Sequence, residues 1–190
     1  MCSNFPKTFP KPLPTPFSAL IVGLVVCFLS SASSLAIAGN LADAERLMKQ
    51  GNLSQALQVV DAHIANRPRA LQERFLKGLI LAEMGRPTEA IAVFKALSEE
   101  FPELPEPYNN LAVLYAQQKQ YDQALAVLEM AIRTHPGYAI ARENLGDLHT
   151  RLAAESYDQA LQLDPSNRSM QLKRTRLREF ISATSPGSAQ

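Results

Sequence analysis

Residues 106–137 read EPYNNLAVLYAQQKQYDQALAVLEMAIRTHPG, and this stretch decides the fold. Two largely apolar segments flank the polar pair Lys119-Gln120, and His135-Pro136-Gly137 follows the second segment. A proline just beyond a helical segment stops the helix from continuing. We therefore predict a hairpin of two helices, over 106–118 and 121–134, joined by a short turn.

Pro136 is the last of three prolines at a fixed interval, because Pro68, Pro102 and Pro136 stand 34 residues apart. Small residues recur in the same phase at positions where two helices must approach closely. They form two rows, Ala56, Ala90 and Ala124 in one and Ala44, Gly78 and Ala112 in the other. A fixed period of this length indicates a repeat array, in which each unit packs on its neighbours.

The third unit carries a characteristic set of residues, which are Tyr108, Leu111, Ala112, Tyr115, Ala124, Leu128, Ala131 and Pro136. This set resembles the tetratricopeptide-repeat (TPR) consensus of an aromatic residue, Leu-Gly, Tyr, Ala, Phe and Pro at matched offsets. The resemblance implies an all-α fold, a right-handed α-solenoid of TPR helix hairpins. We expect three regular repeats, one shortened repeat and a C-terminal capping helix over residues 39–182.

In the first unit we predict helices over 41–49 and 54–65, with Ser54 as the N-cap of the second. In the second unit we predict helices over 69–84 and 88–100, with Pro87 at the first helical position. The helix over 69–84 is apolar on more than one side, so it should be the most buried element. Lys119 replaces the turn glycine of the first two units, which predicts either a left-handed lysine or a turn that avoids positive φ.

The fourth unit is about five residues short. Leu145, Gly146 and His149 keep the phase of the array, but Pro165 comes five residues before the position that Gly146 predicts. The missing residues are those of the turn between the two helices, and no glycine or proline lies between Gly146 and Pro165. We predict one continuous helix over 140–163. The alternative is a very tight hairpin at 151–154.

A last helix follows Pro165-Ser166-Asn167 and runs to about Ser182. Its apolar residues are Met170, Leu177 and Ile181, and its other faces carry Lys173, Arg174, Arg176 and Arg178. We interpret it as a solvating cap on the end of the array. The basic cluster could alternatively contact an anionic partner or surface. We expect residues 183–190 to be a disordered tail.

The first 38 residues differ from the rest of the chain. They contain no acidic residue, and Lys7 and Lys11 precede an apolar run over 17–29 that is followed by small residues ending in Ala36-Ile37-Ala38. This pattern is typical of an export signal cleaved after Ala38, which would leave Asn40 to cap the first helix. The alternatives are an uncleaved membrane anchor over 17–38 and a lipoprotein modified at Cys27.

The sequence offers no constellation for catalysis. Cleavage after Ala38 would remove both cysteines, Cys2 and Cys27, and the three histidines are scattered without a pair at metal-ligand spacing. His149 is expected in the core, where Tyr115 packs in the third unit. Nineteen Lys and Arg residues against eighteen Asp and Glu residues give no field that favours nucleic acid. We expect no active site, no cofactor and no metal site.

The family resemblance implies protein–protein recognition through a concave groove lined by the first helix of each repeat. Carried over position by position, the groove residues are Leu41, Glu45 and Met48, then Phe75, Leu79 and Glu83, then Glu106, Asn109, Val113 and Gln117, then Ile140, Glu143 and Asp147. Apolar side chains alternate with acidic side chains in this set. The groove should therefore favour a ligand with apolar anchor residues and some basic residues.

We therefore predict a non-enzymatic interaction module or scaffold, exported to the periplasm of a bacterial cell envelope, that binds a partner peptide or helix. The alternatives are an envelope assembly factor anchored by the membrane segment or by lipid, and the TPR part of a larger exported enzyme. Some domains of the family that this sequence resembles hold a C-terminal carboxylate with Lys and Asn side chains on the first helix of a repeat. Here the matching positions carry Leu41, Glu45, Phe75 and Leu79, so capture of a chaperone C-terminal tail is disfavoured. The sequence does not name the partner or the oligomeric state.

Overall fold

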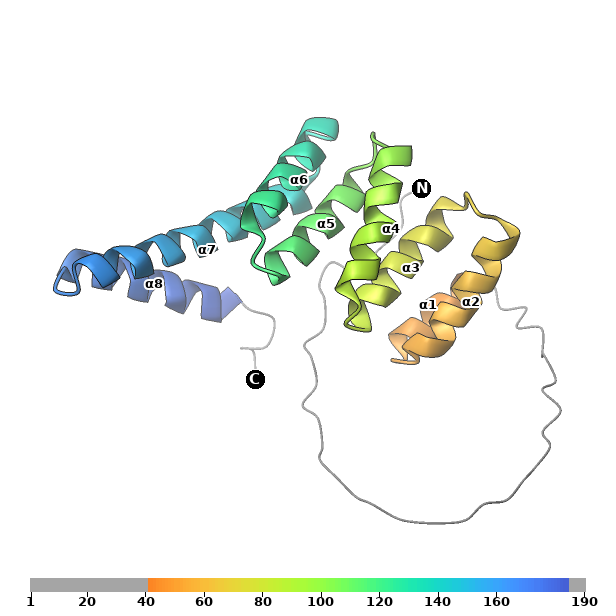
Figure 1. The fold of residues 1–190 in the computed structure, drawn as a ribbon, viewed down its shortest axis with the longest axis horizontal. Helices are drawn as coiled ribbons and strands as arrows, with labels where there is room; N and C mark the ends of the chain where they lie inside the picture. The colour runs from red at the N-terminus through yellow and green to blue at the C-terminus, as the bar shows by residue number, and fades with distance from the viewer. Residues whose placement is uncertain (1–40, 185–190) are drawn as a thin grey trace, which may run out of the picture.

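The computed structural model describes residues 41–184, and in that range every regular element is an α-helix (Figure 1). The helices are α1 (Leu41–Lys49), α2 (Leu53–Asn66), α3 (Leu71–Glu83), α4 (Pro87–Glu100), α5 (Pro105–Gln117), α6 (Tyr121–Thr134), α7 (Ala139–Leu163) and α8 (Arg168–Thr184). The chain is an α-solenoid. Residues 1–40, with the predicted export signal, both cysteines and the proposed cap Asn40, lie outside the described residues, as do residues 185–190.

The first six helices form three hairpins, α1 with α2, α3 with α4 and α5 with α6, and each hairpin packs on the next (Figure 1). We call α1, α3, α5 and the first half of α7 the A helices, and α2, α4 and α6 the B helices. The two rows of small residues lie where A and B helices touch, and all are buried, as in the pairs Ala44 with Ala56 and Ala112 with Ala124. The predicted period thus marks the hairpin contacts.

The closest of these contacts is between Gly78 on α3 and Phe94 on α4. A Cβ atom added to Gly78 would lie 2.6 Å from Cζ of the Phe94 ring, so only glycine fits beneath this side chain. In the third repeat the equivalent pair is Ala112 and Leu128, both buried. The two pairs differ in a matched way. The smaller A-helix residue, glycine, lies beneath the larger B-helix residue, phenylalanine, and alanine lies beneath leucine.

Burial is shared more evenly than the sequence predicted. The helix α3 has seven buried residues, and α5 has the same number, so α3 alone is not the most buried element. The two prolines of α5, Pro105 and Pro107, are buried in its first turn, where the missing N–H groups cost nothing. Each of these helices lies between two hairpins, which explains the equal burial.

The predicted helix boundaries hold to within two residues in most places. Pro87 is the first residue of α4, as predicted, but Ser54 is not an N-cap. The cap position of α2 is Asn52, one residue before Leu53, and no side-chain hydrogen bond is made there. The turn bond from Ala70 N–H to Arg67 O delays the start of α3 to Leu71. Lys119 adopts φ 59°, beside Gly51 at 76° and Gly85 at 70°, so it is the left-handed lysine.

The fourth repeat is the single helix α7, as the five-residue shortfall predicted, and not a tight hairpin. Its first half packs against α6 and α5, and its second half extends away from the stack with α8 folded back along it (Figure 1). Asp158 of α7 accepts from Arg174 at 3.3 Å and from Arg178 at 2.9 Å. The helix α8 therefore covers the projecting half of α7 rather than the end of the stack.

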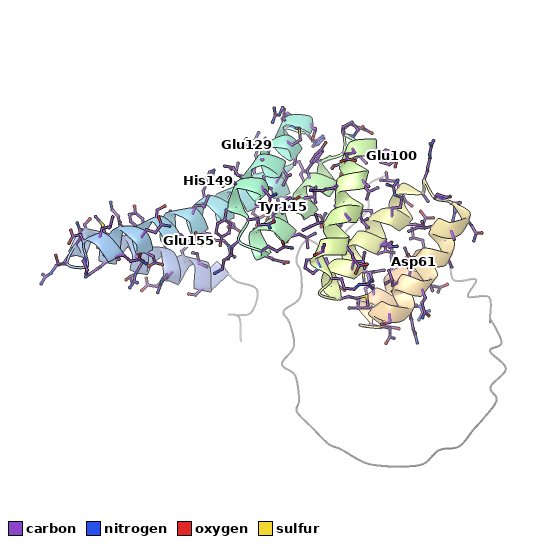
Figure 2. The ribbon with its side chains drawn as sticks, in the orientation of Figure 1. Asp61, Glu100, Tyr115, Glu129, His149 and Glu155 are labelled. Atoms are coloured by element: carbon purple, nitrogen blue, oxygen red, sulfur yellow. The ribbon has the colours of Figure 1, made fainter. Side chains whose placement is uncertain are left out.

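The helix α8 ends at Thr184, within two residues of the end predicted near Ser182, and residues 185–190 lie outside the described residues. One sequence prediction fails in this region. His149 is exposed, whereas Tyr115 at the equivalent position of α5 is buried (Figure 2). Tyr115 is covered because α6 folds back on α5. Because α7 continues straight through residues 151–154, no second helix of the fourth repeat folds back over His149.

We predict that Gly78→Ala destabilises the protein by about 1–3 kcal/mol, because the added methyl group overlaps the Phe94 ring. The matched rescue is Gly78→Ala with Phe94→Leu, which copies the Ala112 and Leu128 pair of the third repeat. Urea denaturation of the four members of this double-mutant cycle measures the coupling. Additive effects of the two substitutions would show that the Gly78–Phe94 contact is not the constraint.

Candidate functional site

The thirteen predicted groove residues occupy the A helices, and we call them together the A-helix face. The helices α1 and α3 are in contact, as are α5 and α7, whereas α3 and α5 are linked through α4. The structure therefore brings the face together in two halves, one on α1 and α3 and the other on α5 and α7. Its members differ in burial. Leu41, Glu45, Met48, Glu83, Glu106, Val113 and Ile140 are half-buried, and Gln117, Glu143 and Asp147 are exposed. These ten side chains present surface to solvent.

The other three members are largely buried. Phe75 is 7% exposed and Leu79 is 8% exposed, and the Phe75 ring meets the Phe94 ring edge-on at a centroid distance of 5.4 Å. Both residues belong to the main core cluster. They therefore form the floor beneath the face and offer little area to a ligand. The accessible apolar residues of the face are instead Leu41, Met48, Val113 and Ile140.

Asn109 is 7% exposed and lies in the contact between α5 and α7. Its Oδ1 accepts a hydrogen bond from Nδ2 of Asn144 at 2.7 Å. Sequence reasoning missed Asn144, which follows Asn110 by one repeat length. Asn110 itself donates to the Glu106 carbonyl at 2.8 Å within α5. The Asn109–Asn144 pair fixes the spacing of two neighbouring A helices.

Three basic side chains of the α3 region are paired with acids. Lys77 contacts Asp61 of α2 at 2.7 Å, and Arg74 contacts Glu100 of α4. Figure 2 labels Asp61 and Glu100 on these B helices. Arg67, in the turn before α3, contacts Glu73 at 3.1 Å. These ion pairs neutralise the cations that lie nearest the A-helix face in the second repeat.

The carboxylates of the A-helix face remain without such neutralisation. Within residues 41–184, no ion pair is formed by its acidic members, which are Glu45, Glu83, Glu106, Glu143 and Asp147. Burial raises the pKa of the Glu83 carboxyl, because desolvation disfavours its charged form. A cation placed beside Glu83 would reverse part of that cost. The face is therefore predisposed toward basic groups.

Tyr138 lies beside this face, in the turn between α6 and α7. Burial, together with the negative charge of Glu106, raises the pKa of its phenol to about 12. Tyr138 therefore stays neutral with its hydroxyl protonated over the physiological pH range, beside a carboxylate of α5. Sequence reasoning also missed this residue, because its position two residues after Pro136 indicated only a turn.

The helix α8 lies at the C-terminal end of the face. Asp147, Ala154 and Asp158 follow one another at intervals of seven and four residues, so they lie on one side of α7. Because α8 binds Asp158, it lies on the continuation of the same side. This helix carries five basic residues and one acidic residue. A basic element therefore stands next to the acidic A-helix face.

Neither a metal site nor a membrane-spanning helix is present among residues 41–184. No three His, Cys, Asp or Glu side chains of this range gather closely enough to hold a metal ion. No helix of this range combines the length and the apolar character needed to cross a bilayer. What the A-helix face does present is half-buried apolar side chains and carboxylates that form no ion pair within residues 41–184.

Two models of the tetratricopeptide repeat match the sequence, one over residues 41–105 and the other over residues 81–145. Together they cover the three regular repeats and the start of α7. The boundaries of the matches end where the array becomes irregular. The projecting half of α7 and all of α8 lie beyond them.

Two known proteins are similar over part of their length. The chloroplastic tetratricopeptide repeat domain-containing protein PYG7 of Arabidopsis thaliana is 33% identical over 84 residues, which are 42% of this chain and 28% of that protein. The phagocyte signaling-impaired protein of Drosophila pseudoobscura pseudoobscura is 28% identical over 90 residues, which are 47% of this chain and 9% of that protein. The matched part is thus less than a third of either relative.

Solved structures share the fold. YrrB, described as a TPR protein with an unusual peptide-binding site, aligns with a TM-score of 0.52 and 26% identity over 54% of this chain and 53% of YrrB. The first TPR domain of human RPAP3 aligns with a TM-score of 0.56 and 12% identity, over 61% of this chain and 91% of that domain. The MamA protein aligns with a TM-score of 0.53 and 18% identity, over 73% and 79%.

We predict that Glu106→Gln lowers the pKa of Tyr138 from about 12 but leaves it above the ordinary value of 10.0, because burial is the larger cause of the shift. Ultraviolet absorption across an alkaline titration, with Tyr138→Phe to identify the signal among the five tyrosines, measures this change. Glu103→Gln, which removes an exposed carboxylate before α5, is the control and should leave the titration unchanged. An equal response to both substitutions would refute the closeness of Glu106 and Tyr138.

Proposed function

Because the chain belongs to the tetratricopeptide-repeat family, we propose that its A-helix face binds an extended peptide or a helix of a partner protein. The fold is that of a protein-interaction scaffold, and the ligand we propose carries basic side chains between apolar ones. The observation that carries this proposal is the uncompensated negative charge of Glu106, Glu143 and Asp147 beside the accessible apolar side chains of Val113 and Ile140. The similar array YrrB, with its unusual peptide-binding site, supports a peptide as the kind of ligand.

The division of charge supports a recognition surface and not a stability device. In the second repeat, Lys77, Arg67 and Arg74 are already paired with Asp61, Glu73 and Glu100. Exposed carboxylates gathered on one face repel one another, so a surface that keeps them gains nothing in stability. An arriving basic ligand relieves that repulsion and forms new ion pairs. Apolar contacts with the half-buried side chains would supply most of the affinity.

We further propose that the protein acts as a non-enzymatic scaffold in a bacterial cell envelope. The support is the sequence of residues 1–38, with Lys7 and Lys11, the apolar run over 17–29 and the small residues before Gly39. The envelope is the compartment that such a leader addresses. The absence of any cysteine from residue 39 onward is compatible with an oxidising compartment.

The groove proposal is tested with synthetic peptides in which leucine alternates with lysine, glutamate or serine. We expect the Leu/Lys peptide to bind most tightly, with affinity that falls as salt is raised. Glu106→Gln, Glu143→Gln and Asp147→Asn together should weaken it about tenfold, at up to about 1 kcal/mol for each exposed ion pair. Fluorescence anisotropy measures the dissociation constants.

The matched control neutralises three exposed carboxylates of the B helices, by Glu99→Gln, Asp122→Asn and Glu129→Gln. It removes the same net charge and should leave binding of the Leu/Lys peptide unchanged. Equal losses in the two triple variants would mean that only the total charge matters. Tighter binding of the Leu/Glu peptide would reject the proposed ligand class.

The export proposal is tested by expressing the full chain in a Gram-negative host and measuring the intact mass of the protein in the periplasmic fraction. We expect a chain that begins at Gly39, because cleavage should follow Ala36-Ile37-Ala38. Ala36→Arg with Ala38→Arg should block cleavage. A chain that retains Met1, or one lipidated at Cys27, would contradict cleavage after Ala38 and indicate an anchored protein instead.

A further inference from the structure

One side of α7 lacks the helix that covers it in the other repeats. We call this side the open face and define it by the exposed residues Arg142, Gly146 and His149. The residues equivalent to Gly146 are Ala44, Gly78 and Ala112, and all three are buried beneath a B helix. Gly146 is exposed, and a Cβ atom added to it meets no atom within 4 Å. The place for a fourth B helix is therefore present and unfilled.

The sequence of that missing B helix is present in the same chain. Tyr157, Ala160 and Pro165 keep the phase of Leu128, Ala131 and Pro136 in the third repeat. Because the turn is about five residues too short, α7 continues straight and carries Tyr157 eleven residues beyond Gly146. At about 1.5 Å per residue, Tyr157 lies roughly 16 Å along the helix from the place it would cover. It cannot reach that place in its own chain.

The open face continues into the projecting half of α7. Gly146, His149, Ala153, Tyr157 and Ala160 follow one another at intervals of three or four residues, so they lie along one side of the helix. The helix α6 packs on a second side, through buried residues such as Ala141 and Leu148, and α8 packs on a third side, through Asp158. On the projecting half, Lys173 of α8 lies over one side of the Tyr157 ring, 5.6 Å from its centroid, and Tyr157 is half-buried. Around Gly146 and His149 the open face is exposed.

We propose that the open face binds α7 of a second copy of this chain, in an antiparallel pair related by a two-fold axis. In this arrangement Tyr157 of each copy covers Gly146 of the other, as Phe94 covers Gly78 within the second repeat. A hinge that is too short to fold back favours such an exchange of elements between copies. The pair would supply to each fourth repeat the B helix that it lacks.

Charge complementarity supports the second copy as the occupant. The register that places Tyr157 over Gly146 brings residue 161 opposite Arg142, and Asp164 follows about three residues, or roughly 5 Å, further along. That distance is within reach of an arginine side chain. Within its own chain Asp164 accepts hydrogen bonds from Ser166 and Asn167, which leave its charge uncompensated. By symmetry the Arg142–Asp164 contact would form at both ends of the pair.

The A-helix face lies on another side of α7, through Glu143 and Asp147, so the contact between the two α7 helices uses none of its residues. The inference is therefore independent of the proposed ligand.

The first test is Gly146→Arg in the full chain. Within one copy the new side chain enters open space, and arginine is a better helix former than glycine, so thermal stability should not fall. In the pair it would displace Tyr157 of the second copy. Light scattering after size exclusion should give the mass of two chains for the unmodified protein at tens of micromolar, and the mass of one chain for the variant.

The matched control for this test is Gln162→Arg, an exposed residue on a different side of α7, which should remain a pair. The second test reverses the charges. Arg142→Asp and Asp164→Arg should each raise the dissociation constant of the pair at least tenfold, and the two together should restore it to within about threefold. This rescue separates pairing through α7 from association through residues 1–40.

A mass of one chain for the unmodified protein at these concentrations would overturn the proposal. So would an unchanged pair in Gly146→Arg, or a double charge reversal that fails to restore what the single reversals lose. Binding of the Leu/Lys peptide by Gly146→Arg should equal that of the unmodified protein, since its A-helix face is intact. Loss of pairing and loss of peptide binding are therefore distinguishable outcomes.

Discussion

The structure depends on one close contact, the approach of each B helix onto a small residue of its A helix. Gly78 beneath Phe94 is the extreme case, because even a methyl group would overlap the ring. Ala44 and Ala112 provide the same contact with less restriction. Each contact fixes how a hairpin closes, and the closed hairpin then presents the surfaces that pack on the next. The 34-residue period, the direction of the A helices and the A-helix face all follow from it.

The sequence predicted those features that depend on residues near one another in the chain. The spacing of apolar residues along a helix and the positions of prolines depend only on nearby residues. The hairpins and the continuous helix α7 could therefore be predicted. Ser54 failed as a cap because Asn52 lies at the helix start, a difference of two residues that the apolar pattern does not resolve. The predicted burial of His149 and the predicted exposure of Asn109 were wrong for a different reason. Their burial depends on a second helix, which is absent beside His149 and present as α7 beside Asn109.

In the second repeat, charge is arranged by helix type. Cations of α3 are held by acids of the B helices, while the carboxylates of the A-helix face have no such partners within residues 41–184. The overall composition, with nineteen basic and eighteen acidic residues, conceals this division. Net charge near zero therefore does not mean a neutral surface. Local separation of charge is what gives a repeat array selectivity, because a ligand meets one face and not the average.

The shortened fourth repeat changes what the end of the array can do. A complete fourth hairpin would cover Gly146 and would place Tyr157 in the core, leaving a closed end with little to recognise. Removal of the turn converts the second half of the repeat into a projecting arm and leaves its first half uncovered on one side. The same side chains that would have closed the repeat then become available to another copy. Because the A-helix face lies on a different side of α7, such a pair would display two ligand faces on one rigid helix pair. In such a pair, the shortened turn would give two linked ligand faces instead of one. Once a partner with two binding segments has bound the first face, its second segment meets the other face at a raised effective concentration.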